Sequence, residues 1–359
     1  MDVGLNSEQL SLRDAVRDIL RAECPPGAAR QAITDPERWR ALWKTVVDLG
    51  WTELAAPLQD GAGDYGPVEL AVVLEECGAV IAPIPLLSSV GLAAGVLRGT
   101  GLDSVLTDIA GGAVATLAVH APGSRLPGAP MTLRDGRLRG RAVAVPNLSR
   151  AELVVTLART DDGDTVAAVA HCGDGVAVLP AAESTDPAQP VAGIDVEAEP
   201  VAVASIDIES AFAAPWIACA ADLVGVARAA LHRSVEHAKS RRQFGQPIGA
   251  FQGIKHALAD NYVSLERARS LTYAAAAALA DPAASPGDAW NSAALAKAAA
   301  GDAAAGCART AVQVHGALGQ TWEHDVHLYV RRAWQGAALL GDSRALYHEV
   351  ARRFCGGAA

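Results

Sequence analysis

A stretch between two predicted helices carries residue types that suit an anionic, aromatic ligand. Ser240–Gln252 reads SRRQFGQPIGAFQ, with two arginines, two phenylalanines and three glutamines in a sequence otherwise rich in alanine. A guanidinium pairs with phosphate, an aromatic ring stacks on a heterocycle, and a carboxamide hydrogen-bonds the edge of that heterocycle. The stretch is equally compatible with an ordinary interhelical turn, in which Phe244 plugs a helical bundle and the arginines are solvated.

Two further motifs favour structural interpretations. The sequence Gly61–Gly66 fits the pattern GxGxxG, which indicates a dinucleotide site only when it follows a buried strand. The preceding WTELAAPLQD is no such strand, so we expect a flexible loop leading into a helix at Pro67. The sequence Glu323–His327 holds two histidines, but no third metal ligand is fixed by spacing, and a solvated or interface helix start is favoured. No GxSxG, P-loop or paired catalytic carboxylate motif is found.

Composition restricts the class of protein. The chain has 359 residues, which suggests two or three domains, and 51% of them are hydrophobic. A formal charge of −10 argues against a nucleic-acid partner. The apolar segment Trp216–Leu231 is interrupted by Asp222 and Arg228, so no membrane span is expected.

The six cysteines are widely spaced, which favours buried free thiols in a reduced cytoplasm over disulfides or a zinc site. The first residues, MDVGLNSEQLSLRD, lack a basic region followed by an apolar core, so no secretory signal is expected. We therefore expect a soluble, cytoplasmic protein.

The elements that must position these residues fall into three predicted domains. Residues 1–112 show helical periodicity, with a cap at Ser7–Leu10 and a helix over Pro67–Cys77. Residues 113–207 show short apolar runs with hairpin turns at Asp135-Gly136 and Asp162-Gly163, which predicts an antiparallel β barrel or sandwich. Residues 208–359 are helical again, with long helices over 209–240, 250–281 and 287–315, typical of a four-helix bundle that oligomerises. The fold class is mainly α with a central β domain.

The whole chain resembles the acyl-CoA dehydrogenase family of flavoproteins. The order of α, β and α domains agrees, and LGWTELAAPLQDGAGDYG is similar to an N-terminal family segment. Arg241-x-x-Phe244-Gly245 followed by Gln252 matches the R-x-x-FG…Q signature. The sequence Gln313–Gly319 resembles the Q-x-x-GG-x-G turn, and Arg331-Arg332 stands where the family carries its helical "RD" pair.

The resemblance implies a reaction and exposes departures from it. In the family a glutamate takes an α-proton from an acyl-CoA thioester while the flavin N5 of FAD accepts the β-hydride. Here Leu340 stands at the usual glutamate position, and Pro215 stands at an alternative position for the base. Two β-domain segments that contact flavin in the family, TEPxxGSD and KxWIT, are replaced by Val119–Ser124 and Arg141–Pro146. No catalytic residue is therefore expected in this chain.

The same resemblance implies that the chain keeps half of a cofactor site. In the family each FAD bridges two subunits, one holding the ring and the neighbour holding the adenosine and pyrophosphate. The neighbour's residues correspond to Arg241 on the pyrophosphate, Phe244 beside the adenosine, Gln252 and Gln313 as hydrogen-bonding groups, and Gly316 in a turn that lets backbone approach.

The expected protein is thus the non-catalytic subunit of an α2β2 heterotetramer. Its homologous catalytic partner would bind most of the acyl-CoA, and electron-transfer flavoprotein or a similar acceptor would take the electrons. Two-subunit members of this kind act on steroid side-chain CoA thioesters, which places the chain in lipid metabolism and steroid degradation. Two alternatives remain open: a self-sufficient homotetramer with Asp342 or Asp222 as the base, and a flavin-free scaffold or acyl-CoA-binding protein.

Overall fold

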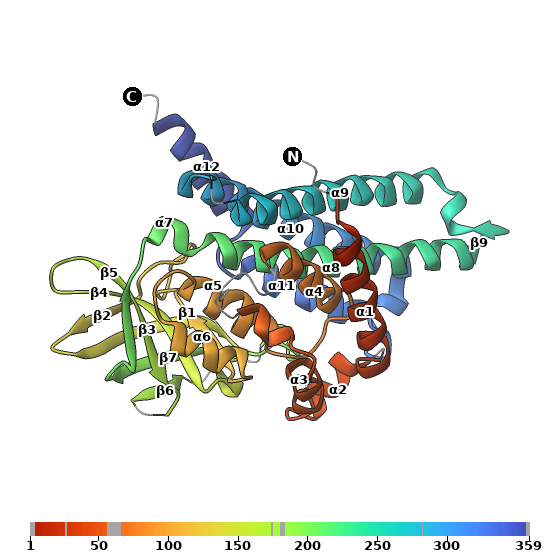
Figure 1. Cartoon of the computed structure of the whole chain (residues 1–359). Coiled ribbons are helices and arrows are strands. Elements are labelled where there is room, and N and C mark those ends of the chain that lie inside the picture. Colours follow the sequence, from red (N-terminus) through yellow and green to blue (C-terminus); the bar gives the residue numbers. More distant parts are fainter. Residues whose placement is uncertain are drawn as a thin grey trace.

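A computed structural model describes residues 4–25, 27–55, 66–173, 175–179, 184–281 and 283–356 (Figure 1). Helices form the first part of the chain, a β-sheet follows, and long helices complete it. The predicted fold class, mainly α with a central β domain, is confirmed. Most of the GxGxxG motif, residues 61–65, lies outside the described residues.

The N-terminal helices begin at a cap one residue earlier than predicted. The Asn6 side chain accepts a hydrogen bond from the Gln9 amide at 2.8 Å, and the Gln9 side chain accepts one from the Asn6 amide at 3.0 Å. This reciprocal pair satisfies two amides that the first turn leaves without partners. The elements are α1 (Ser7–Glu23), α2 (Ala28–Thr34), α3 (Trp39–Asp48), a 3₁₀ turn (Trp51–Ala55), α4 (Pro67–Ala79), a π-helix (Leu87–Ala93) continuing into α5 (Ala94–Leu97), and α6 (Asp103–Ala110).

The central sheet is mixed, and this corrects the expectation of a purely antiparallel one. Its order is β6-β7-β3-β2-β4-β5-β8, and β1 pairs with β4. Both β1 and β2 run parallel to β4. The chain reverses after β2 and again after β3, so β2 and β4 share a direction, and the sequence does not show that they are neighbours. The strands are β1 (Ala115–Ala118), β2 (Met131–Arg134), β3 (Arg137–Pro146), β4 (Leu153–Arg159), β5 (Thr165–His171), β6 (Val176–Leu179), β7 (Val191–Ala198) and β8 (Ala202–Ser205).

Both predicted hairpin turns are confirmed. Asp135 and Gly136 have φ of +48° and +71°, as a two-residue turn between β2 and β3 requires. The second turn, around Gly163 at φ +88°, joins β4 to β5. Strand β4 alternates between two cores: Val155 and Leu157 pack with the helices, whereas Val154 and Ala158 pack in a separate core of the β domain.

The C-terminal helices lie close to the predicted ranges. They are α7 (Ile208–Ala211), α8 (Ala213–Ser240), α9 (Gln252–Ala280), α10 (Pro286–His315), α11 (Val326–Ala338) and α12 (Ser343–Gly356). By length and mean hydropathy, 1.5, the span Ile208–Ser240 resembles a membrane-crossing helix, but 89% of its most apolar window is buried in the protein. The apolar surface of α8 therefore packs the core.

Two glycines allow α4 and α8 to cross with their backbones in contact. A Cβ atom on Gly78 would lie 2.0 Å from the Asp222 carbonyl oxygen, and one on Gly225 would lie 1.9 Å from the Glu75 carbonyl oxygen. No side chain fits at either position, because real Cβ atoms do not approach so closely. This crossing fixes the position of α8 against the N-terminal helices.

Candidate functional site

The stretch that raised the question of a ligand forms an exposed hairpin. Arg241 caps the end of α8, and β9 (Arg242–Gln243) pairs with β10 (Gln246–Pro247) beyond the rest of the molecule (Figure 1). The turn is Phe244-Gly245, with φ of +51° and +82°. Phe244 is 92% exposed and meets Phe251 edge-on, with ring centroids 6.0 Å apart. The interpretation in which Phe244 plugs the bundle is therefore wrong.

The other predicted residues belong to the same end of the bundle. Gln252 begins α9, Gln313 lies in the last turn of α10, and Gly316 caps that helix at φ +62°. The rings of His237 on α8 and His315 on α10 stack with centroids 4.2 Å apart. This contact holds the ends of α8 and α10 side by side. We name Arg241, Phe244, Gln252, Gln313 and Gly316 the bundle-end group.

The polar side chains of the bundle-end group have no partner among the described residues. Those of Arg241, Gln252 and Gln313 are exposed, and they make no hydrogen bond or ion pair with any other described residue. Arg242 differs, because its guanidinium donates to the Gly245 carbonyl at 3.0 Å within the hairpin. Nothing within 4 Å would meet a Cβ on Gly316, so the turn is open to an approaching group. These donors suit an anionic ligand or a partner chain.

A cluster of three histidine rings at this end was not predicted from the sequence. His315 stacks on His237 and lies 4.7 Å from the ring of His324. Burial, with the nearby charge of His315, lowers the pKa of both His237 and His324. His327 stacks instead on Trp322 at 5.1 Å, and no cluster suited to a metal occurs in the described part of the chain. The histidines therefore serve packing between helix ends, a contact that their sequence spacing does not reveal.

Leu340, the residue predicted to stand at the family's glutamate position, is buried by packing. Leu340 is 1% exposed and has φ +57°. Its amide donates to His120 Nε2 at 3.2 Å, and its carbonyl accepts from Trp216 Nε1 at 2.8 Å. The fully buried Lys297 donates to the carbonyls of Ala337 at 3.1 Å and Gly341 at 3.3 Å. We name Leu340, His120, Trp216 and Lys297 the closed group.

The surroundings of the closed group disfavour the charged forms of its two basic side chains, Lys297 and His120. Burial lowers the pKa of Lys297, and burial together with the charge of Lys297 lowers the pKa of His120. Both side chains are positioned by backbone partners of the loop after α11. Sequence reasoning missed His120, Trp216 and Lys297 because they come from three separate segments of the chain.

The two carboxylates considered as alternative bases are engaged in ion pairs. Asp342 pairs with Arg125 at 2.5 Å and accepts from the Ala345 amide at 2.9 Å. Burial acts in the opposite direction, but these hydrogen bonds lower the pKa of Asp342. Asp222 is 2% exposed and lies 3.5 Å from Arg332, which also pairs with Asp186. Burial raises the pKa of Asp222 to about 6, against the opposing effect of Arg332.

The two β-domain segments that the resemblance places at the family's flavin contacts, Val119–Ser124 and Arg141–Pro146, make contacts within the chain itself. Arg141 pairs with Asp195 on β7 at 2.7 Å. The register of β3 against β7 shifts between Ala142 and Val145, and Ala144 between them has φ +54°. The segment after β1 contributes the buried His120 to the closed group. The segment Arg141–Pro146 contains neither an indole nor a hydroxyl.

Comparison with known proteins agrees with this architecture. Residues 6–103 match the acyl-CoA dehydrogenase N-terminal domain, and residues 208–354 match the C-terminal domain. The chain is 31% identical over 354 residues to the acyl-CoA dehydrogenase IpdE2 of Mycobacterium tuberculosis, with 96% of each chain covered.

Two solved structures are also similar to the chain. The ChsE4-ChsE5 complex from Mycobacterium tuberculosis is 28% identical with a TM-score of 0.87, and 99% of each chain is covered. The Tcur3481-Tcur3483 steroid ACAD is 26% identical with a TM-score of 0.87, and 98% of each chain is covered. The chain therefore belongs to the acyl-CoA dehydrogenase family.

Proposed function

We propose that this chain is the non-catalytic subunit of a heteromeric, FAD-dependent acyl-CoA dehydrogenase, of α2β2 composition. One observation carries the proposal: the position of the family glutamate is buried within the closed group, while the bundle-end group is exposed and uncommitted. A chain of this kind has no base of its own to offer but has ligands for a cofactor that a neighbour holds.

The bundle-end group fits the adenosine and pyrophosphate of FAD. Arg241 would pair with the pyrophosphate, Phe244 would pack beside the adenosine, and Gln252 and Gln313 would hydrogen-bond it. Gly316 gives backbone access, because a side chain at its positive φ would be strained. FAD, when bound, supplies the acceptor for the hydride that leaves the acyl chain.

Phe244 gives independent support. A phenylalanine at positive φ is an outlier that costs of order 1–3 kcal/mol, and such strain commonly marks a ligand contact. Within the described residues its exposed ring gains only the edge contact with Phe251. Contact with a bound cofactor would account for both the exposure and the conformation.

The substrate and partners follow from the relatives in outline. Two similar structures are complexes of two named chains, and one of them is described as a steroid ACAD. We therefore propose a homologous catalytic partner, a steroid side-chain CoA thioester as substrate bound mainly by that partner, electron-transfer flavoprotein or a similar acceptor, and a cytoplasmic location.

Co-expression with a homologous catalytic subunit tests the proposal. The lone chain should purify without stoichiometric FAD, whereas the complex should carry the flavin absorption bands and dehydrogenate an acyl-CoA. FAD and turnover in the lone chain would instead establish the self-sufficient homotetramer. A co-expressed complex that carries no flavin would favour the flavin-free scaffold.

A further inference from the structure

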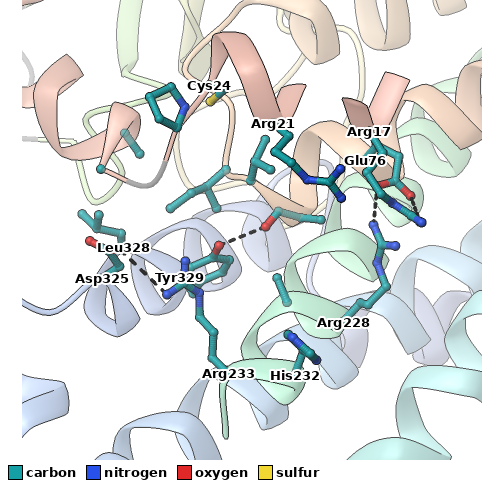
Figure 2. A pocket seen from close by; sticks show the side chains of 17 residues that line it. Arg17, Arg21, Cys24, Glu76, Arg228, His232, Arg233, Asp325, Leu328 and Tyr329 are labelled. Atoms are coloured by element: carbon teal, nitrogen blue, oxygen red, sulfur yellow. Dashed lines mark hydrogen bonds and ion pairs between the residues drawn. The ribbon is translucent and has the colours of Figure 1, made fainter. Parts of the chain in front are cut away.

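A pocket that shares no lining residue with the bundle-end group lies between α1, α4, α8 and the start of α11 (Figure 2). Its volume is about 560 Å³, within the roughly 300–1,000 Å³ usual for small-molecule sites. Four arginines line it against two carboxylates, in a chain whose formal charge is −10. A cationic concavity in an acidic protein concentrates anions locally.

Two of the four arginines form a fixed wall. Arg17 donates to both carboxylate oxygens of Glu76, at 3.1 and 2.9 Å, and Arg228 pairs with Glu76 at 2.9 Å. Glu76 is 3% exposed. Burial opposes its ionisation, but the two guanidinium groups outweigh that effect and lower the pKa of Glu76. Arg228 also lies 3.4 Å from Glu75 and Arg17 lies 3.7 Å from Asp14, so carboxylates hold both guanidinium groups in place and the charge for a ligand must come from the other two arginines.

The other two arginines are available to a ligand. Arg233 lies 3.8 Å from Asp325, a carboxylate that already pairs with Arg30 at 2.7 Å. The guanidinium of Arg233 also lies 5.0 Å above the ring of Tyr329. Among the residues that the structure describes, Arg21 pairs only with Asp18, and both side chains are 72% exposed. An exposed pair of this kind contributes little and is readily exchanged for a ligand anion.

The floor of the pocket is apolar and rigid. Ile81 and Leu328 are buried there, and Tyr329 is fixed by the hydrogen bond from its hydroxyl to the Ala79 carbonyl at 2.9 Å. Burial raises the pKa of the Cys24 thiol to about 11, so this lining residue stays protonated and weakly nucleophilic. The surroundings thus favour binding over covalent chemistry.

We propose that this pocket binds a small organic anion with an apolar body. Its carboxylate or phosphate group pairs with Arg21 and Arg233, and its body rests on Ile81, Leu328 and the ring of Tyr329. The site is independent of the proposed function, because it shares no residue with the bundle-end group or the closed group. A ligand there touches α1, α4, α8 and α11 at once and therefore stabilises their packing.

Calorimetry on the purified full chain tests the site with four probes: decanoate, decyl phosphate, decanol and inorganic phosphate. Decanoate or decyl phosphate should bind at one site per chain, and the tighter of the two identifies the headgroup. Decanol and inorganic phosphate should each bind at least about tenfold more weakly than that probe, because each lacks one half of the ligand. Equal binding of decanol, or of inorganic phosphate, would overturn the proposal.

Arginine variants localise the binding. Arg233→Gln and Arg21→Gln should each weaken the tighter probe about tenfold or more, as expected for loss of a charged hydrogen bond. Arg21 is largely exposed, so its variant keeps the fold even if Arg233→Gln does not. Arg40→Gln on α3, outside the pocket lining, is the matched control and should bind normally. Unchanged affinity in Arg21→Gln and in a folded Arg233→Gln would refute the assignment.

Discussion

The bundle-end group and the closed group differ in whether their polar side chains have partners within the chain. At the bundle end, the side chains of Arg241, Gln252 and Gln313 lie exposed at helix ends and remain without partners among the described residues. Around Leu340, an indole, an imidazole and an ammonium group are all bonded to the backbone of one loop. The first region leaves its polar groups accessible from outside the chain, whereas the second pairs its polar groups within the chain. Substitutions in the first should affect binding, and those in the second should affect stability.

The largest effect is expected from Trp216→Ala in the closed group. The variant loses a buried side chain that is 2% exposed and leaves the Leu340 carbonyl without its donor. We expect the free energy of unfolding to fall by about 3–5 kcal/mol, measured by urea denaturation. Trp334→Ala removes an indole that is 58% exposed and should cost far less. Equal losses in the two variants would mean that the closed group is not held by packing.

Leu340→Glu should be somewhat less damaging and should restore no activity. A carboxylate at a position that is 1% exposed is buried without a designed partner, which costs about 3 kcal/mol or more. Thermal unfolding and an acyl-CoA dehydrogenation assay on the chain alone check both statements. Leu340→Met conserves volume and should cost below about 1.5 kcal/mol. Dehydrogenation by the glutamate variant would show that this chain holds a latent site.

Arg241→Ala should weaken FAD binding in the reconstituted complex and leave stability almost unchanged, the opposite of the two substitutions in the closed group. Loss of a charged hydrogen bond should weaken FAD retention about 10- to 100-fold, although the catalytic partner is unchanged. Stability should stay within about 0.5 kcal/mol, because the side chain is exposed. Equilibrium dialysis of FAD measures the first quantity. Arg242→Ala, whose guanidinium bonds within the hairpin, is the control, and equal FAD loss in both variants would count against Arg241 as a phosphate ligand.

The smallest effect concerns the Arg125–Asp342 pair beside the closed group. Because the folded-state pKa of Asp342 is lowered, the pair stabilises the protein above the unfolded pKa of about 3.9, and this stability is lost as pH falls. Arg125→Ala should cost about 0.2–1 kcal/mol at neutral pH, since both side chains are partly exposed. The difference from wild type should shrink as pH falls below about 3.9 and should disappear at pH values below the lowered pKa of folded Asp342. A difference that persists there would assign the loss to packing.

The sequence predicts helices and turns better than it predicts which strands pair in the sheet. The long helices and both hairpin turns follow from composition and turn residues, so their positions are close to those observed. The parallel pairing of β1 and β2 with β4 depends on which strands meet in space, and short apolar runs do not contain that information.

The same distinction holds for the sites. Arg241, Phe244 and Gln252 could be singled out because they lie in one continuous stretch, whereas Gln313 and Gly316 came from the family resemblance, and the role of all five toward FAD stays a prediction. The closed group and the arginine pocket could not, because their members come from distant segments. Only the four-residue spacings of Arg17 with Arg21 and of Arg228 with His232, each on one helix face, hinted at the pocket.

The close approaches of Gly78 to the Asp222 carbonyl and of Gly225 to the Glu75 carbonyl give α8 a pivot near its middle. About 15 residues separate Gly225 from the hairpin end, which is roughly 22 Å at 1.5 Å per residue. A tilt of about 5° at the pivot would displace the hairpin by about 2 Å over that arm. Trp216 lies on the opposite arm and would swing the other way. A bulky residue at either glycine would therefore disturb the exposed hairpin and the packed loop together, although it touches neither.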